Sequence, residues 1–227
     1  LTLETKDSNL VILQLVDGQY RAVPHTVVDG VVTILTKTSG TFIVSNEQVS
    51  FSDIDNLFSK EEIEFLANRH VVLGADGAFM PNSALTRGQF AMMIARALGL
   101  QTSENNPFTD TVGKEYEKDV QALFEAGITT GTSDTTFDPT AKITREQSAA
   151  FMARVFEYMG MKANTSSTVS YSDDEAISNV YAAAIALLAE YDIMTGKSDG
   201  TFDPKGHLSR AEMAKIFKRT LNKAGLM

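Results

Sequence analysis

The chain has 227 residues, of which 43% are hydrophobic and 22% are charged, a composition typical of a globular protein and not of a disordered one. Its net charge of −9 argues against nucleic acid as a partner, because binding phosphates requires a basic surface. It contains no cysteine, which excludes disulfides and thiolate metal sites. No apolar run approaches the roughly 20 residues that cross a membrane.

Residues 1–48 predict a small antiparallel β unit. An apolar run, a turn pair (Asp17-Gly18) and a second run together form residues 10–23, a pattern typical of a β-hairpin, and further short β-prone runs follow. So few short strands bury little apolar surface. We therefore expect that this unit either packs on another part of the protein or is the tail of an upstream domain. Because the chain begins with Leu1 and not with Met, we interpret it as a piece of a longer protein.

The rest of the chain, residues 49–227, repeats itself three times. Each copy opens with an aromatic residue, a Ser or Thr, and an Asp. It then runs through an amphipathic stretch to a glycine, and through a Phe-x-Pro loop to a helix start that contains an arginine. We call the copies repeat 1 (49–100), repeat 2 (106–161) and repeat 3 (169–227). The recurrent residues are Asp53, Asp110 and Asp173; Gly74, Gly131 and Gly196; and Arg87, Arg145 and Arg210. Each copy predicts helix, loop and helix, so we expect a mainly α fold preceded by the small antiparallel β unit.

The second helix of each repeat has a recognisable start. A Ser or Thr is followed three residues later by Gln or Glu, so that each side chain can bond a backbone N–H that the first turn leaves free. These predicted capping boxes are Thr86/Gln89, Thr144/Gln147 and Ser209/Glu212, and the first helix of repeat 1 has a fourth at Ser59/Glu62. Gly99 and Gly160 predict the ends of two of these helices.

The recurrent arginine directly follows the cap, where the partial positive charge of the helix N-terminus disfavours a cation. Two explanations are open. The arginine can be held by an internal salt bridge, for instance to an Asp of the same or a neighbouring repeat. Alternatively, the guanidinium and the free helix N–H groups form a receptor for a carboxylate or a phosphate.

The recurrent Asp and Gly residues also have two interpretations each. The Asp is either a turn or helix-cap residue, or a group that orients the arginine or bonds a sugar hydroxyl. The Gly is either a helix-exit or turn residue with positive φ, or an opening through which a ligand reaches the backbone. The phenylalanines of the Phe-x-Pro loops, Phe79, Phe137 and Phe202, predict buried core positions.

Together these motifs resemble the S-layer homology family. The aromatic-x-Asp start, the glycine, the Phe-x-Pro loop and the Thr-Arg or Ser-Arg helix start recur in order three times over residues 51–226. The resemblance implies that three tandem repeats of a bacterial S-layer or cell-surface protein close into one pseudo-threefold helical bundle. The sequence departs from the family pattern in lacking the usual tryptophan, and in repeat 1, where the loop is one residue shorter and Leu73 replaces a Thr. The family's Thr-Arg-Ala-Glu helix start reads Thr-Arg-Gly-Gln in repeat 1 and Thr-Arg-Glu-Gln in repeat 2, so only repeat 3 keeps both the Ala and the Glu.

The function that the resemblance implies is a non-catalytic, non-covalent anchor outside the cell, in the cell wall or S-layer. Grooves between repeats are expected to receive pyruvylated sugars of an anionic secondary cell wall polysaccharide, which is itself attached to peptidoglycan. The recurrent arginines would meet the ketal carboxylate, and the recurrent Asp and Gly residues would line the grooves. The resemblance implies no cofactor and no metal, a monomeric fragment, and a full protein able to self-assemble into a surface array.

Other functions fit the residues less well. The three histidines have no metal-ligand spacing and no nucleophile beside them, which argues against an enzyme. Asp199-Gly200 and Asp203 resemble a calcium loop but lack the alternating ligands and final Glu of an EF-hand. The main alternative is a helical-repeat scaffold that binds another protein through exposed apolar residues.

Overall fold

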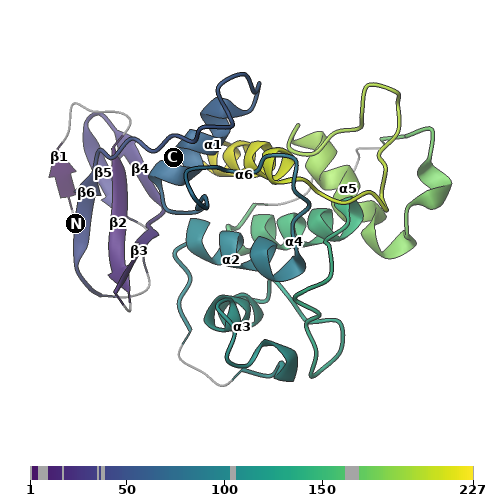
Figure 1. Ribbon diagram of the computed structural model, residues 1–227, viewed down its shortest axis with the longest axis horizontal. Helices are drawn as coiled ribbons and strands as arrows, with labels where there is room; N and C mark the ends of the chain where they lie inside the picture. The colour runs from purple at the N-terminus through teal and green to yellow at the C-terminus, as the bar shows by residue number, and fades with distance from the viewer. Residues whose placement is uncertain are drawn as a thin grey trace.

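A computed structural model describes residues 2–4, 10–16, 18–34, 36, 39–102, 106–161 and 169–226. The strands lie together at one side of a larger group of helices, which the rest of the chain forms (Figure 1). The predicted fold is therefore confirmed in its coarse form, a mainly α chain with a small antiparallel β unit at its N-terminal side.

The β unit consists of two three-stranded antiparallel sheets. One has the order β1 (Thr2–Glu4), β5 (Val31–Ile34), β4 (His25–Val28), and the other has the order β3 (Gln19–Ala22), β2 (Val11–Val16), β6 (Phe42–Ser45). The hairpin predicted over residues 10–23 is confirmed as β2 and β3, with Leu13 opposite Ala22, although Asp17 of its turn lies outside the described residues. The strand β4 was not anticipated; it pairs with β5 across a turn at Asp29-Gly30, where both residues have positive φ.

Contacts join the β unit to the helices. Ala22 at the end of β3 is buried in the same apolar core as the helices. Arg21 Nη1 donates a hydrogen bond to Asp119 Oδ1 at 2.6 Å, an ion pair in which the carboxylate is only 3% exposed. Burial raises the pKa of Asp119, and the charge of Arg21 opposes that rise. The thin strand core is thus extended by packing on the helical part of the chain.

Each repeat contributes two helices. They are α1 (Lys60–Asn68) and α2 (Arg87–Ala97) in repeat 1, α3 (Glu117–Glu125) and α4 (Arg145–Tyr158) in repeat 2, and α5 (Asn179–Glu190) and α6 (Arg210–Lys223) in repeat 3. Short 3-10 turns, η1 (Thr109–Thr111) and η2 (Asp174–Ala176), follow the aromatic starts of repeats 2 and 3. The helix ends predicted at Gly99 and Gly160 are confirmed, and both glycines have positive φ.

The predicted capping boxes are confirmed at α2, α4 and α6, where both reciprocal bonds are present. The fourth prediction, Ser59/Glu62 at α1, is wrong: the Ser59 side chain makes no capping bond. The backbone explains the difference, since Ser59 has ψ 13° whereas the three working caps have ψ between 159° and 162°. An N-cap hydroxyl reaches the helix N–H groups from that extended conformation.

The core is built from the repeats together. The predicted burial of the loop phenylalanines is confirmed, since Phe79, Phe137 and Phe202 are 0% exposed. Phe90 of α2 meets Phe151 of α4 and Phe217 of α6 edge-on, with ring centroids 5.8 and 5.6 Å apart. One ring from each second helix thus enters a shared core, which no single repeat could form alone.

The residues just before the three caps bond to one another through their backbones in a cycle. Leu85 N donates to Leu208 O at 3.0 Å, Leu208 N donates to Ile143 O at 3.2 Å, and Ile143 N donates to Leu85 O at 3.1 Å. Repeat 1 therefore contacts repeat 3, repeat 3 contacts repeat 2, and repeat 2 contacts repeat 1. The starts of α2, α4 and α6 are brought together by these bonds.

Candidate functional site

The recurrent arginines lie where one repeat meets the next. Arg87, Arg145 and Arg210 are the first residues of α2, α4 and α6, and each is only 6–8% exposed. Each Nε donates to the carbonyl of the loop phenylalanine of the following repeat. The pairs are Arg87–Phe137 at 2.8 Å, Arg145–Phe202 at 2.8 Å and Arg210–Phe79 at 2.7 Å. We call these pairs the first, second and third junctions.

At every junction the guanidinium also lies over the ring of the same phenylalanine. The distances from Cζ to the ring centroid are 4.7, 5.1 and 4.4 Å at the first, second and third junctions. Cations at such distances are attracted by the face of the ring. At all three junctions the arginine thus has internal partners, a carbonyl and a ring of the neighbouring repeat. The internal salt bridge, one of the two open explanations, forms only at Arg145, where the partner is Glu212 of repeat 3 and not an aspartate; no described residue forms an ion pair with Arg87 or Arg210.

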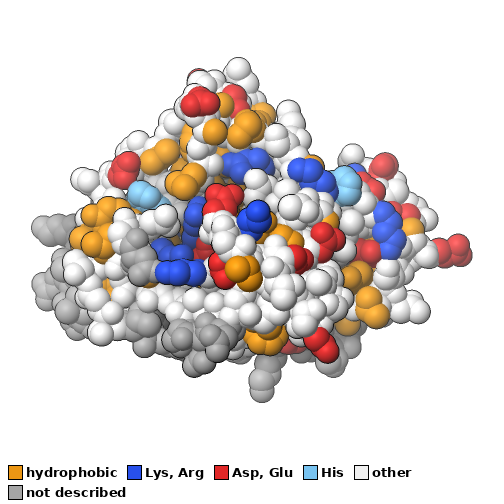
Figure 2. Space-filling view, turned by 60° about the horizontal axis from the view of Figure 1, so that its bottom comes forward, with side chains coloured by type: hydrophobic (Ala, Val, Ile, Leu, Met, Phe, Trp, Pro, Cys, Tyr) orange, Lys and Arg blue, Asp and Glu red, His pale blue; other side chains and the backbone are white. Residues whose placement is uncertain are grey.

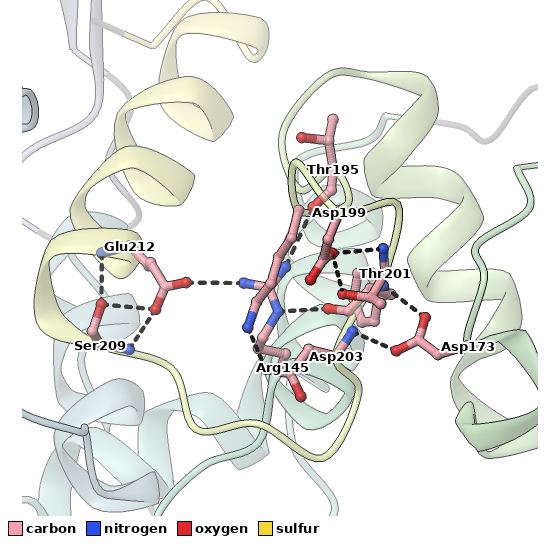
Figure 3. A network of polar contacts seen from close by, with 10 residues as sticks. Arg145, Asp173, Thr195, Asp199, Thr201, Asp203, Ser209 and Glu212 are labelled. Carbon is pink, nitrogen blue, oxygen red and sulfur yellow. Dashed lines mark hydrogen bonds and ion pairs between the residues drawn. The ribbon is translucent and has the colours of Figure 1, made fainter.

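The terminal nitrogens of the three guanidinium groups differ in their partners. Arg210 Nη2 donates to Leu73 O at 2.8 Å. Arg145 Nη2 donates to Thr195 O at 3.3 Å, and its Nη1 lies 3.2 Å from Glu212 Oε1 (Figure 3). The terminal nitrogens of Arg87 make no hydrogen bond to a described residue. Burial lowers the pKa of Arg87 and of Arg210, yet a guanidinium remains protonated in proteins, so each junction holds a buried cation.

The recurrent aspartates hold the Phe-x-Pro loops of their own repeats. Each carboxylate accepts bonds of 2.7–2.9 Å from two successive backbone N–H groups of the loop. The donors are Phe79 and Met80 for Asp53, Phe137 and Asp138 for Asp110, and Phe202 and Asp203 for Asp173. The second donor of each pair has φ between 57° and 60°, a left-handed conformation that the clamp stabilises. The hydrogen bond from Phe79 N is the largest cause of the lowered pKa of Asp53. The aspartates therefore fix the carbonyls that the arginines bind.

The recurrent glycines leave room for the aromatic ring that opens each repeat. A Cβ on Gly74 would lie 2.4 Å from the Phe51 ring, and one on Gly131 would lie 2.4 Å from the Phe108 ring. On Gly196 it would lie 2.7 Å from the ring of Tyr171. Of the two interpretations open for these glycines, the turn residue with positive φ holds at Gly131, whereas Gly74 and Gly196 do not have positive φ. Close packing, and not a left-handed backbone, excludes a side chain at those two positions.

The structure groups the candidate residues across repeats. The first junction combines Arg87 with Asp110 and Gly131 of repeat 2. The second combines Arg145 with Asp173 and Gly196 of repeat 3. The third combines Arg210 with Asp53 and Gly74 of repeat 1. The sequence identifies these residues as recurrent but does not say which copies meet.

Glu146 is a further residue at the second junction that the sequence interpretation missed. Its side chain is buried, accepts from Ser178 N at 3.1 Å and lies 2.5 Å from Lys205 Nζ. The signal was available, because Glu146 occupies the position where repeats 1 and 3 have Gly88 and Ala211. An acidic residue at that helix position ties repeat 2 to repeat 3.

The acidic loop of repeat 3 is engaged by its own residues. Asp199 accepts from the Thr201 hydroxyl at 2.7 Å, and Asp203 forms an ion pair with Lys197.

Within the described ranges, no three His, Asp or Glu side chains gather as metal ligands would. None of the helices described is long and apolar enough to cross a membrane. On the face drawn in Figure 2, Lys and Arg side chains lie among Asp and Glu side chains, without a broad patch of either sign.

A family model described as the S-layer homology domain matches residues 50–91, 107–149 and 170–214, which is more than half of the chain. The chain belongs to the S-layer homology domain family. The three matches fall within the three repeats, so the tandem S-layer homology repeats predicted from the sequence are confirmed. This family consists of non-catalytic anchoring modules, which places the chain at the cell surface in association with the cell wall.

Named relatives include both enzymes and S-layer proteins. An endoglucanase of Bacillus sp. (strain KSM-635) is 35% identical over 175 residues, which cover 75% of this chain and 18% of the relative. An amylopullulanase of Thermoanaerobacterium thermosulfurigenes is 34% identical over 180 residues, covering 78% and 10%. The S-layer protein sap of Bacillus anthracis is 29% identical over 163 residues, covering 70% and 20%. The chain spans about a fifth or less of the length of these relatives, and what they share with it is the S-layer homology region.

Proposed function

We propose that this chain anchors its protein non-covalently by binding an anionic, pyruvylated secondary cell wall polysaccharide in the grooves between repeats. The observation that carries the proposal is a buried cation without an anion. Arg87 and Arg210 are each 8% exposed, and neither has an ion pair with a described residue. A buried charge without a counter-charge is costly, so the ketal carboxylate of a pyruvylated sugar would compensate it.

The surroundings of these arginines suit a carboxylate ligand. Each guanidinium stands at the N-terminus of a helix longer than ten residues, where the helix dipole favours negative charge. The first two backbone N–H groups of each of these helices already donate to carbonyls of the neighbouring repeat, so the guanidinium and not the helix N–H groups would meet the carboxylate. The chain as a whole has a net charge of −9, so attraction to an acidic polymer must be local to these cations and not a property of the overall surface. In this proposal the recurrent Asp and Gly residues act by shaping the loop that faces each arginine.

We further infer a pseudo-threefold arrangement of the repeats, with one groove at each junction. The cyclic bonds among Leu85, Ile143 and Leu208 support it, as do the equivalent arginine contacts at the three junctions. Several sites of modest affinity on one repetitive polymer give avidity without any tight single site. Retention on the wall would therefore not require strong binding at any one groove.

The test of this function is a pull-down with purified wall sacculi. The chain is expected to bind intact sacculi, to lose binding when the secondary polysaccharide is stripped, and to lose it when only the pyruvate is removed. All three samples use the unaltered protein, so the result does not depend on whether a variant folds. Equal binding to intact and depyruvylated sacculi would contradict the carboxylate mechanism.

The arginine variants are the second arm of the same test. Single Arg→Gln changes are expected to weaken retention modestly, and the triple change R87Q/R145Q/R210Q is expected to abolish it. Because these side chains also join the repeats, each variant must first show a wild-type circular dichroism spectrum. A folded triple variant that still binds wall polysaccharide would overturn the role given to the arginines.

A protein-interaction scaffold is the second candidate, and exposed apolar side chains favour it. Phe58 is 75% exposed and Val180 is 81% exposed. If such side chains mediate the function, as self-assembly into a surface array would require, F58S/V180S should abolish retention while removal of pyruvate from the wall leaves it unchanged. The polysaccharide mechanism predicts the opposite result for both changes.

A further inference from the structure

The three junctions differ in the charge that faces the arginine. At the second junction, Nη1 of Arg145 lies 3.2 Å from Oε1 of Glu212, and the two side chains are 7% and 38% exposed. At the first and third junctions no ion pair joins the arginine to a described residue. Arg145 therefore already holds a carboxylate that belongs to the chain, whereas Arg87 and Arg210 do not.

The capping box of α6 fixes this carboxylate in place. Oε2 of Glu212 accepts from Ser209 N at 2.9 Å and lies 2.7 Å from Ser209 Oγ. With Oε2 bound in this way, Oε1 is directed at the Arg145 guanidinium (Figure 3). The carboxylate cannot turn away from Arg145 without disturbing the cap of the helix.

The residues at the equivalent positions of repeats 1 and 2 are neutral. Gln89 and Gln147 complete the capping boxes of α2 and α4 by accepting from Thr86 N and Thr144 N through Oε1. They cap the helix as Glu212 does but carry no negative charge. Because the second junction is built from repeat 3, it alone receives the acidic version of this residue.

We propose that Glu212 is an internal competitor that makes the second junction the weakest of the three for a carboxylate ligand. This inference rests on the proposed function, since it concerns which groove takes the ketal carboxylate first. An incoming carboxylate at Arg145 must displace Glu212 or bind beside it against like-charge repulsion, whereas at Arg87 it meets neither cost. Glu212 thus sets an order of occupation, in which the first junction fills before the second.

A titration followed by ¹H–¹⁵N correlation spectra can resolve the junctions. The probe is a methyl hexoside carrying a 4,6-linked pyruvate ketal, and the same hexoside without the ketal is the control ligand. The backbone amides of Gly131, Gly196 and Gly74 report on the first, second and third junctions. In the wild-type chain we expect the Gly131 midpoint at about tenfold lower probe concentration than the Gly196 midpoint, which corresponds to about 1.4 kcal/mol.

Two reciprocal variants test the competitor. Glu212→Gln completes the capping box of α6 with the same neutral residue type that completes those of α2 and α4, and it should lower the Gly196 midpoint about tenfold while leaving the Gly131 midpoint unchanged. Gln147→Glu places the acid at the first junction, with the capping chemistry of Ser209/Glu212, and should raise the Gly131 midpoint by a similar factor. Both substitutions preserve an acceptor for the cap, so the fold is retained.

The outcomes separate this inference from the function on which it rests. If the probe shifts the glycine amides but neither variant moves its midpoint, the competitor role is overturned and the polysaccharide mechanism stands. If the probe shifts none of the three amides in any of the proteins, the polysaccharide mechanism is overturned, and the competitor role falls with it. Shifts that the control hexoside reproduces equally would also overturn both, since the carboxylate would then contribute nothing.

Discussion

The first and second junctions have the same backbone hydrogen bonds between repeats but differ in the side chain that follows the arginine. At the first, Gly88 N donates to Pro139 O at 2.9 Å, and at the second, Glu146 N donates to Pro204 O at 3.1 Å. Gly88 lies against the Tyr116 ring, whereas Glu146 binds across to the following repeat through an ion pair and two hydrogen bonds. The backbone contacts between repeats therefore persist while the residue after the arginine decides whether the interface is apolar or ionic.

This comparison separates the roles of main chain and side chain. The cyclic backbone bonds and the Arg-to-carbonyl bonds need no particular residue at the second helical position, so they define the geometry of every junction. The side chain at that position then adjusts how tightly two repeats are held and which charges surround the arginine. Exchanging residues between junctions should change stability without changing the arrangement.

Transferring the acid to the first junction should have the largest effect. In Gly88→Glu, the new Cβ would lie 2.9 Å from Tyr116 Cδ1 and 3.1 Å from Pro139 O, and Thr140 stands where repeat 3 supplies Lys205. Crowding and an unpaired, largely buried carboxylate should lower the free energy of unfolding by about 3 kcal/mol. Urea denaturation measures this, with Gly88→Ala as the control for crowding alone. A loss below about 1 kcal/mol for Gly88→Glu would mean that the first junction accepts an ionic contact as readily as the second.

Removing the acid from the second junction should have the next largest effect. Glu146→Ala leaves Ser178 N without its acceptor and removes the carboxylate that pairs with Lys205 Nζ, which should lower the free energy of unfolding by about 2 kcal/mol. The matched control Glu146→Gln keeps an acceptor for Ser178 N and loses the ion pair together with the acceptor for the Ser178 hydroxyl, so it should lower the free energy of unfolding by less. If both variants lose the same amount in urea denaturation, the ion pair and not the hydrogen bond to Ser178 carries the stabilisation.

At the third junction, Asp53 should make the stability of the chain depend on pH. Hydrogen bonds from the loop, chiefly from Phe79 N, hold its folded-state pKa below the unfolded value of about 3.9. The folded state then binds fewer protons, so this contribution is fully present above the unfolded pKa and is lost as pH falls through the folded pKa. Because Asp53 is solvent-exposed, Asp53→Asn should cost only about 1 kcal/mol at neutral pH. It should also flatten the loss of stability in acid, which thermal unfolding between pH 2 and pH 7 would measure; an unchanged acid slope would contradict the clamp.

The smallest effect is expected for Lys205, the exposed partner in the ion pair with Glu146. The Lys205 side chain is 58% exposed, so screening by water and salt limits what its pairing with Glu146 contributes. Lys205→Gln should lower the free energy of unfolding by about 0.5 kcal/mol at low ionic strength and by nothing measurable at about 1 M salt. A loss that persists at high salt would show that Lys205 acts through its packing and not through its charge.

Features fixed by neighbours in the chain could be predicted from the sequence. The capping boxes of α2, α4 and α6 join residues three apart, and the β2–β3 hairpin joins strands separated by a short turn, so both follow from local pattern. The capping box predicted at Ser59 and Glu62 does not form, although both residue types suit it, because the backbone at Ser59 is not extended. The local sequence pattern therefore identifies residues that can cap a helix, but it does not give the backbone conformation that capping requires.

Features that depend on which repeat meets which could not be predicted in this way. Periodicity identifies Arg87, Asp110 and Gly131 as recurrent, but it gives no sign that the arginine of one repeat meets the loop of the next. The glycines could not be assigned for a different reason. At Gly74 and Gly196 the absence of a side chain makes room for an aromatic ring of the same repeat, 23 and 25 residues earlier in the sequence, and the local backbone does not require it. Glu146 is an exception, since it breaks the repeat pattern at a position where its side chain contacts the next repeat.

The cycle of bonds among the residues before the three caps has a mechanical consequence. A linear stack of repeats has an outermost member that is held on one side only, and a pulling force can peel it away first. Here the bond from Leu85 to Leu208 and the packing of α1 on α6 join the first repeat to the last, so every repeat is held on both sides. Under tension, detaching any one repeat must break two interfaces at once, and the module should resist unravelling until it yields as a whole.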